Sequence, residues 1–173
     1  MPKIIENLRS QLLLEAKRQI EDVGYAKTTV RSVASACGVG VGTVYNYFSS
    51  KDMLIASFML EDWQTCLADM KNAPKETPEG LLHHVYQALR AFIHKHRALF
   101  GDPVAAKTFA STLAERHGML RSQLAEALRP ACDGASAPDK DFLAHFLAES
   151  LLTWTVAGKP FESLSPILCQ LIK

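Results

Sequence analysis

The residues between Thr28 and Lys51 include an amide, several hydroxyl groups and a cation at helical spacing. Asn46 is the side chain best suited to hydrogen-bond the edge of a base, and the apolar Val41 suits the methyl group of thymine. Hydroxyl and ammonium groups suit phosphate oxygens, and here they belong to Thr43, Tyr45, Tyr47 and Lys51. These residue types predict noncovalent recognition of duplex DNA.

A short helix is predicted directly before these groups. The hydroxyls of Thr28 and Thr29 can accept hydrogen bonds from the free amides of a helix that begins near Val30. Gly38 is expected to end this helix, because glycine adopts the left-handed backbone conformation without a side-chain penalty. The inward positions follow at helical spacing on one side and are Val33, Ala34 and Cys37. The pattern therefore predicts a helix followed by a sharp turn.

A second short helix is predicted to carry the polar groups. Val39 is expected to fill the corner between the helices, and Val44 with Tyr47 or Phe48 to form the inner face. Glycines near the helix start cost about 1 kcal/mol each relative to alanine, but they let the partly positive amide end approach bases and phosphates. The residues predicted to contact DNA are Thr28, Thr29, Arg31, Gly40, Val41, Gly42, Thr43, Tyr45, Asn46, Tyr47 and Lys51.

A tight helical hairpin inside an all-α core is the alternative explanation of this spacing. An ordinary exposed helix carries charged and polar side chains on its open face. The face left open here is instead rich in hydroxyl and aromatic groups. That difference favours the DNA-binding interpretation of a helix-turn-helix.

The chain resembles the TetR family of bacterial transcriptional regulators over roughly residues 8 to 60. The resemblance is most specific from Gly24 to Leu54, which reads G-Y-x-x-T-T-V-R-x-V-A-x-x-x-G-V-x-x-G-T-V-Y-N-Y-F-x-S-K-x-x-L. It implies a three-helix DNA-binding head, a helical regulatory body and a homodimer. Gly40 and Val41 depart from the pattern, because many members carry a capping residue and a polar residue there. Base recognition in this chain is therefore expected to use fewer side chains.

The whole chain is predicted to be all-α, with an N-terminal three-helix helix-turn-helix head joined to a helical-bundle body. The predicted domains are 1–49 for DNA binding and 50–173 for ligand binding and dimerisation. Gly118 marks a candidate kink or split in one long helix. Besides the two short helices, helices are expected at about 3–22, 50–72, 79–97, 104–129, 139–157 and 160–172.

The last two predicted helices carry apolar residues on more than one face, so one core does not account for them. We predict a two-fold interface between two copies of the chain, built from this helix pair. Its residues are Phe142, Phe146, Ser150, Trp154, Leu164 and Leu168. A monomer whose body buries them all is the alternative, but symmetric DNA recognition favours the dimer.

The family resemblance also implies a small-molecule effector that binds in the body and shifts the fourth helix. The residues predicted to line its pocket are Trp63, Tyr86, Phe92, Phe109 and Leu113. Such a pocket would favour a largely apolar ligand, although aromatic residues at helical spacing also form ordinary cores. The effector's identity, the operator sequence, the regulated genes and the direction of regulation are not specified by the sequence.

Composition and charge favour a globular protein over a membrane protein. The 173 residues are 48% hydrophobic and 21% charged, which suits one or two globular domains. Residues 1–51 carry a net charge of +3 and residues 52–173 one of −2, compatible with phosphate contact at one end. Charges interrupt the N-terminal segment, and no apolar run approaches the ~20 residues that span a bilayer. A cytoplasmic protein without a membrane partner is therefore expected.

Catalytic, metal and cofactor sites are not expected. The sequence lacks a glycine-rich phosphate loop, a nucleophile elbow and paired cysteine motifs, so an enzyme is not predicted. The histidines lack metal-ligand spacing on a helix. The cysteines are scattered, and reduced single thiols are expected, with a redox role of Cys37 as the alternative.

We predict from these features a homodimeric repressor of a palindromic operator that a small molecule releases. A helical ligand-binding or partner-binding module without DNA-binding activity is the alternative. Intact hydroxyl groups on the second short helix, at Tyr45 and Tyr47, favour the regulator.

Overall fold

The computed structural model describes residues 7–112 and 114–173, and within these ranges the chain is all-α, as predicted. The described residues form ten α-helices and a short 3-10 helix, Arg129–Cys132, and no strand. No helix among them is long and apolar enough to cross a membrane. The α-helices are α1 Leu8–Val23, α2 Val30–Ala36, α3 Val41–Tyr45, α4 Lys51–Lys71, α5 Pro78–Lys95, α6 Arg97–Phe100, α7 Pro103–Thr112, α8 Ala114–Leu128, α9 Lys140–Val156 and α10 Phe161–Leu171.

The chain packs as two compact units. The head unit comprises residues up to Asp62 together with His96–Thr112, and the body unit comprises Trp63–Lys95 and the chain from Leu113 onward. The helix α4 therefore runs from one unit into the other, and α6 and α7 belong to the head unit. The division of function between residues 1–49 and 50–173 stays a prediction, because packing groups the chain differently.

The head begins with an amphipathic helix, α1, which buries one apolar face. The next helix, α2, begins after Thr29, whose side-chain oxygen accepts a hydrogen bond of 3.0 Å from the amide of Ser32. The Ser32 hydroxyl in turn accepts from the Thr29 amide at 3.0 Å. This reciprocal pair is a capping box, which satisfies two amides at the helix start. The predicted hydroxyl cap at the start of α2 is confirmed for Thr29, whereas the Thr28 hydroxyl donates to the carbonyl of Gly24 instead.

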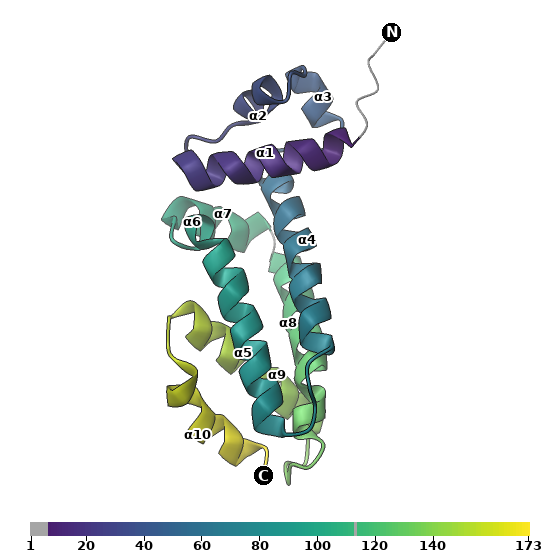
Figure 1. The fold of residues 1–173 in the computed structure, drawn as a ribbon, viewed down its shortest axis with the longest axis vertical. Helices are drawn as coiled ribbons and strands as arrows, with labels where there is room; N and C mark the ends of the chain where they lie inside the picture. Colours follow the sequence, from purple (N-terminus) through teal and green to yellow (C-terminus); the bar gives the residue numbers. More distant parts are fainter. Residues whose placement is uncertain (1–6, 113) are drawn as a thin grey trace. The chain divides into compact units, whose positions relative to one another are not determined.

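A sharp turn joins α2 to α3, as the sequence predicts. Gly38 has a φ of 67°, in the left-handed region that glycine tolerates best. The Val39 amide then returns to the carbonyl of Ala34 at 3.0 Å, which closes the end of α2. Ala34 is 1% exposed, consistent with a small residue between closely packed helices. Figure 1 shows α2 and α3 side by side and next to α1.

The recognition helix α3 is shorter than the two turns that the sequence suggests. Its five residues, Val41–Tyr45, begin after Gly40 without a side-chain cap. Two glycines at the start favour helix weakly, which is consistent with the short element. The chain continues as a turn in which the amides of Tyr47 and Phe48 bond to the carbonyl of Val44, at 3.0 and 2.9 Å.

The structure gives α7 and α8 over the range predicted as one helix, on either side of residue 113, which lies outside the described residues. Gly118 lies inside α8, so the candidate split into two helices at this residue is wrong. A single glycine inside a helix costs only about 1 kcal/mol, which the surrounding helix tolerates.

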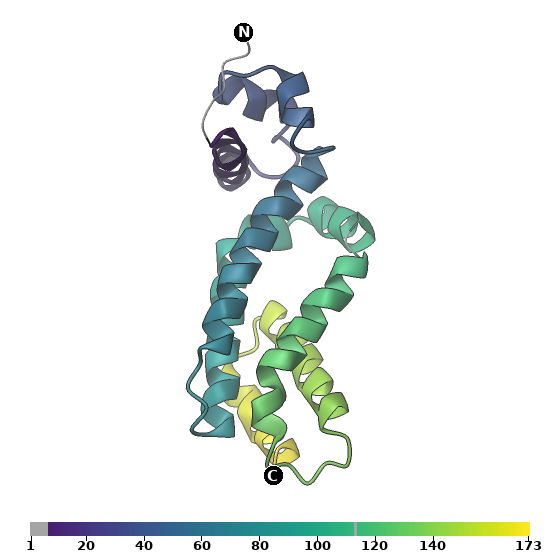
Figure 2. The ribbon, with the colours of Figure 1, turned by 90° about the vertical axis from the view of Figure 1, so that its right-hand side faces the viewer.

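The body unit is a bundle in which α5 packs against α9 and α10. The helices α8 and α9 run beside each other through this unit (Figure 2). Its core is aliphatic, and among its fully buried side chains are Leu82, Leu89, Leu124, Leu147 and Leu151. The α9 helix starts at a cap, because the Asp139 carboxylate accepts a hydrogen bond of 2.8 Å from the Phe142 amide.

The core of the head can be tested with two leucines of α1. Leu12 is 0% exposed and Leu14 is 70% exposed. We expect Leu12→Ala to lower the free energy of unfolding by about 3 kcal/mol, because it leaves a cavity, and the same change at Leu14 to cost under about 0.5 kcal/mol. Urea unfolding followed by circular dichroism measures both, and equal losses would contradict this assignment of the core.

Candidate nucleic-acid interface

The face of α3 that the sequence assigns to DNA is open. Tyr45 is 52% and Tyr47 48% exposed, and Asn46 lies between them and is exposed as well. Gly40 and Gly42 are exposed, whereas Val41 and Thr43 are half-buried. The opposite side is anchored by Val44 and Phe48, which are 0% and 4% exposed. Of the two aromatic residues proposed for the inner face, Phe48 therefore fills it.

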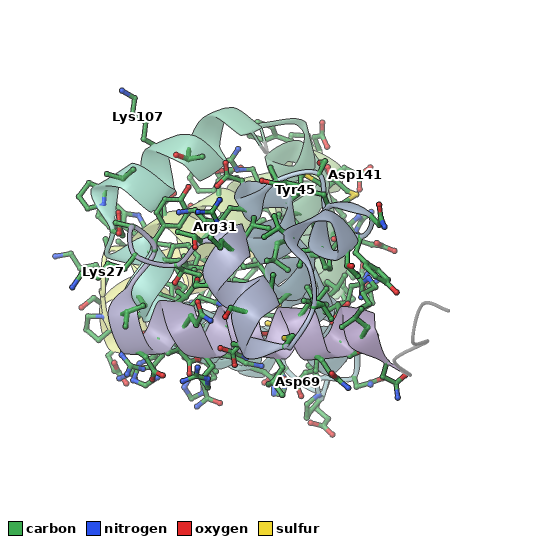
Figure 3. The ribbon with its side chains drawn as sticks, turned by 90° about the horizontal axis from the view of Figure 1, so that it is seen from above. Lys27, Arg31, Tyr45, Asp69, Lys107 and Asp141 are labelled. Carbon is green, nitrogen blue, oxygen red and sulfur yellow. The ribbon has the colours of Figure 1, made fainter. Side chains whose placement is uncertain are left out.

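The start of α2 adds exposed cations to this surface. Thr29 and Arg31 are exposed, as a contact with phosphate requires. Lys27, two residues before Thr29, is also exposed, and the sequence reasoning did not include it. Its position, two residues before the capping Thr29, could have identified Lys27 as a candidate from the sequence. In Figure 3, which views the structure from above, Arg31 lies on α2, Tyr45 on α3, and the side chain of Lys27 extends away from the ribbon.

Two residues of the predicted contact set are used inside the head. The Thr28 side chain is buried, and its hydroxyl donates to the carbonyl of Gly24 at 2.9 Å. The Lys51 ammonium donates to the carbonyl of Tyr25 at 2.9 Å and lies 3.7 Å from the centroid of the Tyr25 ring. Burial lowers the pKa of Lys51. Thr28 and Lys51 thus have partners inside the head, and their contacts with DNA stay a prediction.

A chain of hydrogen bonds ties the start of α2 to α1. The Ser32 hydroxyl donates to the side-chain oxygen of Gln19 at 2.6 Å, and the Gln19 amide donates to the Glu15 carboxylate at 2.7 Å. Hydrogen bonds from Arg18 and Gln19 lower the pKa of Glu15, so this carboxylate stays charged at neutral pH. The capping residues of α2 are thus held by a polar network that includes the largely buried Gln19.

Cys37 at the end of α2 is half-buried with a free thiol. Burial raises the pKa of Cys37, so its reactive thiolate form is less populated at neutral pH than in a free cysteine. This environment does not favour the redox alternative. In the described part of the chain no three metal-ligating side chains come together as an ion site.

Comparisons with known proteins agree with this geometry. Residues 12–58 match the model of the bacterial regulatory proteins of the tetR family. The HTH-type transcriptional repressor Rv1474c of Mycobacterium tuberculosis is 30% identical over 139 residues, which cover 75% of this chain and 71% of that protein. The chain belongs to the TetR family. It is accordingly a DNA-binding transcriptional regulator with a helix-turn-helix head.

Other relatives extend over more of this TetR-family chain. The HTH-type transcriptional regulator BetI of Burkholderia thailandensis is 26% identical over 94% of this chain and 90% of its own length. Among solved structures, BioQ in complex with its double-stranded DNA operator covers 95% of this chain and 96% of its own, with a TM-score of 0.65 and 20% identity. A TetR-like regulator from Rhodococcus sp. RHA1 covers 98% and 96%, with a TM-score of 0.63 and 20% identity. These two structural likenesses concern the fold.

The body of this TetR-family regulator exposes large apolar side chains on α9. Phe142, Phe146 and Trp154 are 68%, 46% and 45% exposed, and Ser150 is half-buried. All four belong to the predicted dimer interface. Their exposure leaves them available for a partner.

Leu164 and Leu168 on α10 are buried within the chain, so their predicted interface role stays a prediction. They are 8% and 4% exposed and belong to the body's own core. Ile167 and Leu171 are the open apolar residues of this helix, at 63% and 38% exposure. The sequence shows an apolar face on α10, but it does not show which side of that face meets the body.

Three of the five residues predicted to line an effector pocket, Trp63, Tyr86 and Phe92, lie in or beside the body core. The Trp63 ring nitrogen donates to the side-chain oxygen of Gln123 at 3.0 Å, and the Tyr86 hydroxyl donates to the carbonyl of Lys159 at 2.9 Å. Phe92 meets Trp63 edge-on with ring centroids 5.5 Å apart. The side chain of Phe109 and all of Leu113 lie outside the described residues. The pocket role of these residues stays a prediction.

The outward face of α5 bounds a shallow surface recess of about 520 Å³. The side chains at its edge are polar or basic except for one alanine. They belong to Gln87, Arg90, Ala91, His94 and Lys95.

The two cations Arg31 and Lys51 can be distinguished by salt dependence. Arg31→Met should reduce the slope of log affinity against log salt by about 0.9, the contribution of one phosphate contact. Lys51→Met should leave that slope unchanged, because its ammonium is bound to Tyr25. Fluorescence anisotropy with a labelled duplex over a salt series measures both. A reduced slope for Lys51→Met would restore Lys51 as a phosphate contact.

Neighbouring residues on α3 should differ in what they recognise. Tyr45→Ala should weaken binding by a similar factor on all duplexes, because a phosphate contact carries no sequence information. Asn46→Ala should cost about 1–3 kcal/mol and relax the preference at one base pair. Affinities for a panel of single-base operator variants separate the two patterns. A uniform loss from Asn46→Ala would remove its base-reading role.

Proposed function

We propose that this regulator is a cytoplasmic homodimer that represses transcription by binding a palindromic operator and leaves it when a small molecule binds. The exposed apolar face of α9 and α10 carries this proposal. We define that face as the α9–α10 face, consisting of Phe142, Phe146, Trp154, Ile167 and Leu171. The two helices are in contact, and large apolar side chains left exposed on neighbouring helices typically mark an interaction site.

A second copy of the chain is the partner that best suits this face. Each head offers only one short recognition helix, and one helix reads few base pairs. Two copies related by a two-fold axis would place two such helices about 34 Å apart, in successive major grooves of a palindromic site. A helix pair that meets its own copy forms a four-helix interface, a common architecture for symmetric dimers.

Repression is supported by the names of relatives. Rv1474c is named a transcriptional repressor, and the BioQ structure contains that protein's own operator. A repressor needs no surface for recruiting polymerase, since occupation of a promoter is enough. Release by an effector requires that the effector bind more tightly to a conformation with low operator affinity.

Two places in the body unit are candidates for the effector. The aromatic set around Trp63 and Phe92 would take an apolar molecule, although its rings fill the core in the present state. The recess along α5 would take a molecule with negative charge, because Arg90 and Lys95 border it. Selection of bound sequences from random duplex DNA, repeated with apolar and anionic compound sets, tests the repressor and the effector class together. Failure to enrich any sequence would overturn the proposal.

The oligomeric state tests the proposed interface directly. Sedimentation at micromolar concentration should give twice the 19.1 kDa chain mass. Phe146→Glu and Ile167→Glu should each shift the protein to the monomer mass, because a charge in an apolar interface is costly. Leu14→Glu, which places the same charge on an exposed leucine of the head, is the matched control and should remain dimeric. A monomeric wild type would exclude the dimer.

A further inference from the structure

The segment between α1 and α2 is fastened to two other helices of the head by one tyrosine. Tyr25 is 6% exposed, and its hydroxyl donates to the Asp52 carboxylate at the start of α4, at 2.6 Å. The same hydroxyl accepts a hydrogen bond from Thr108 of α7. On the other side of the residue, the Lys51 ammonium binds the Tyr25 carbonyl and lies against its ring. Tyr25 is therefore held at both its backbone and its phenol.

Tyr25 and its partners Lys51 and Asp52 lie on either side of the DNA-contacting segment in the sequence. Tyr25 lies four residues before Thr29, the capping residue of α2. Lys51 and Asp52 open the helix that follows the recognition element. One buried phenol thus fixes the chain entering the helix-turn-helix to the chain leaving it. Tyr25 therefore joins the chain before the DNA-contacting segment to the chain after it.

We propose that Tyr25 is a positioning residue for DNA binding and that Thr108 of α7 holds it in place. A phenol that donates to one partner and accepts from another has a fixed orientation, which a single hydrogen bond does not impose. Burial, the largest influence, raises the pKa of Tyr25, which keeps the phenol protonated as a donor at neutral pH. Without Thr108, the ring keeps its partner on α4 and loses its partner on α7.

The position of Thr108 in the chain, between two helices of the body unit, makes this contact relevant to regulation. Residues His96–Thr112 pack with the head unit, whereas α5 before them and α8 after them belong to the body unit. The segment carrying Thr108 is therefore tied covalently to the body at both ends. A rearrangement of α5 or α8 would act on α7, and through Thr108 on Tyr25 and the start of α2. This route reaches α2 directly and does not require α4 to move.

The test compares Thr108→Val with Thr108→Ser, which keeps the hydroxyl. Val104→Thr is the matched control, since it makes the reverse exchange at a residue of α7 that is 62% exposed. Hydrogen exchange of the amides of residues 29–36 is measured well below the Tm of every variant. Thr108→Val should accelerate exchange in the first turn of α2 about fivefold, the loss expected from one hydrogen bond. Thr108→Ser and Val104→Thr should exchange at the wild-type rate.

DNA affinity gives the second readout, using the duplex that the wild-type protein selects. Thr108→Val and Tyr25→Phe should each weaken binding about fivefold, and the double variant should be no weaker than Tyr25→Phe alone. The salt slope should stay at the wild-type value, because no phosphate contact is lost. A merely structural role would lower Tm and leave the affinity of the folded protein unchanged.

Two outcomes would overturn the proposal. The first is wild-type exchange in α2 together with wild-type affinity in a folded Thr108→Val protein. The second is a salt slope reduced by about 0.9 in Tyr25→Phe, which would make Tyr25 a phosphate contact. Hydrogen exchange needs no DNA and no dimer, so a failed operator selection or a monomeric wild type would be distinguished from a failure of this inference.

Discussion

Burial of Val44 and Phe48 is the interaction on which the DNA-binding surface depends. A helix of five residues is not stable by itself in water, since isolated helices shorter than about 12–15 residues are marginal. The α3 element exists because Val44 is wholly enclosed and Phe48 nearly so. Tyr45 at its end and Asn46 and Tyr47 in the turn that follows are exposed on a backbone that would not hold this shape alone. Affinity for DNA is consequently coupled to the packing of the head.

The local features of the head were largely predictable from the sequence. A capping hydroxyl, a left-handed glycine and a small residue at a crossing each have one dominant structural use, so Thr29, Gly38 and Ala34 are where the pattern places them. The sequence is less informative about side chains with several possible uses. Thr28 and Lys51 carry groups suited to phosphate, but a partner inside the head takes each of them. Spacing along the chain does not reveal those partners, because Lys51 and Tyr25 are 26 positions apart.

The body was predicted less well, for a different physical reason. Periodicity identifies an apolar face but not its neighbour. Both Leu164 and Ile167 belong to apolar positions of α10, and only the packing of the bundle buries the first and exposes the second. Gly118 is a weak helix former, but it is accommodated within α8.

The two glycines at the start of α3 limit how the head can distinguish one DNA sequence from another. Gly40 and Gly42 offer no side chain to a base, so few positions of an operator can be read by direct contact. Discrimination among sites must then depend in part on how readily a given sequence adopts the groove width and bend that the proposed dimer would require. Flexible pyrimidine–purine steps between the half-sites would influence affinity although no side chain touches them. The deformability of the operator DNA would thus contribute to recognition alongside direct contacts with its bases.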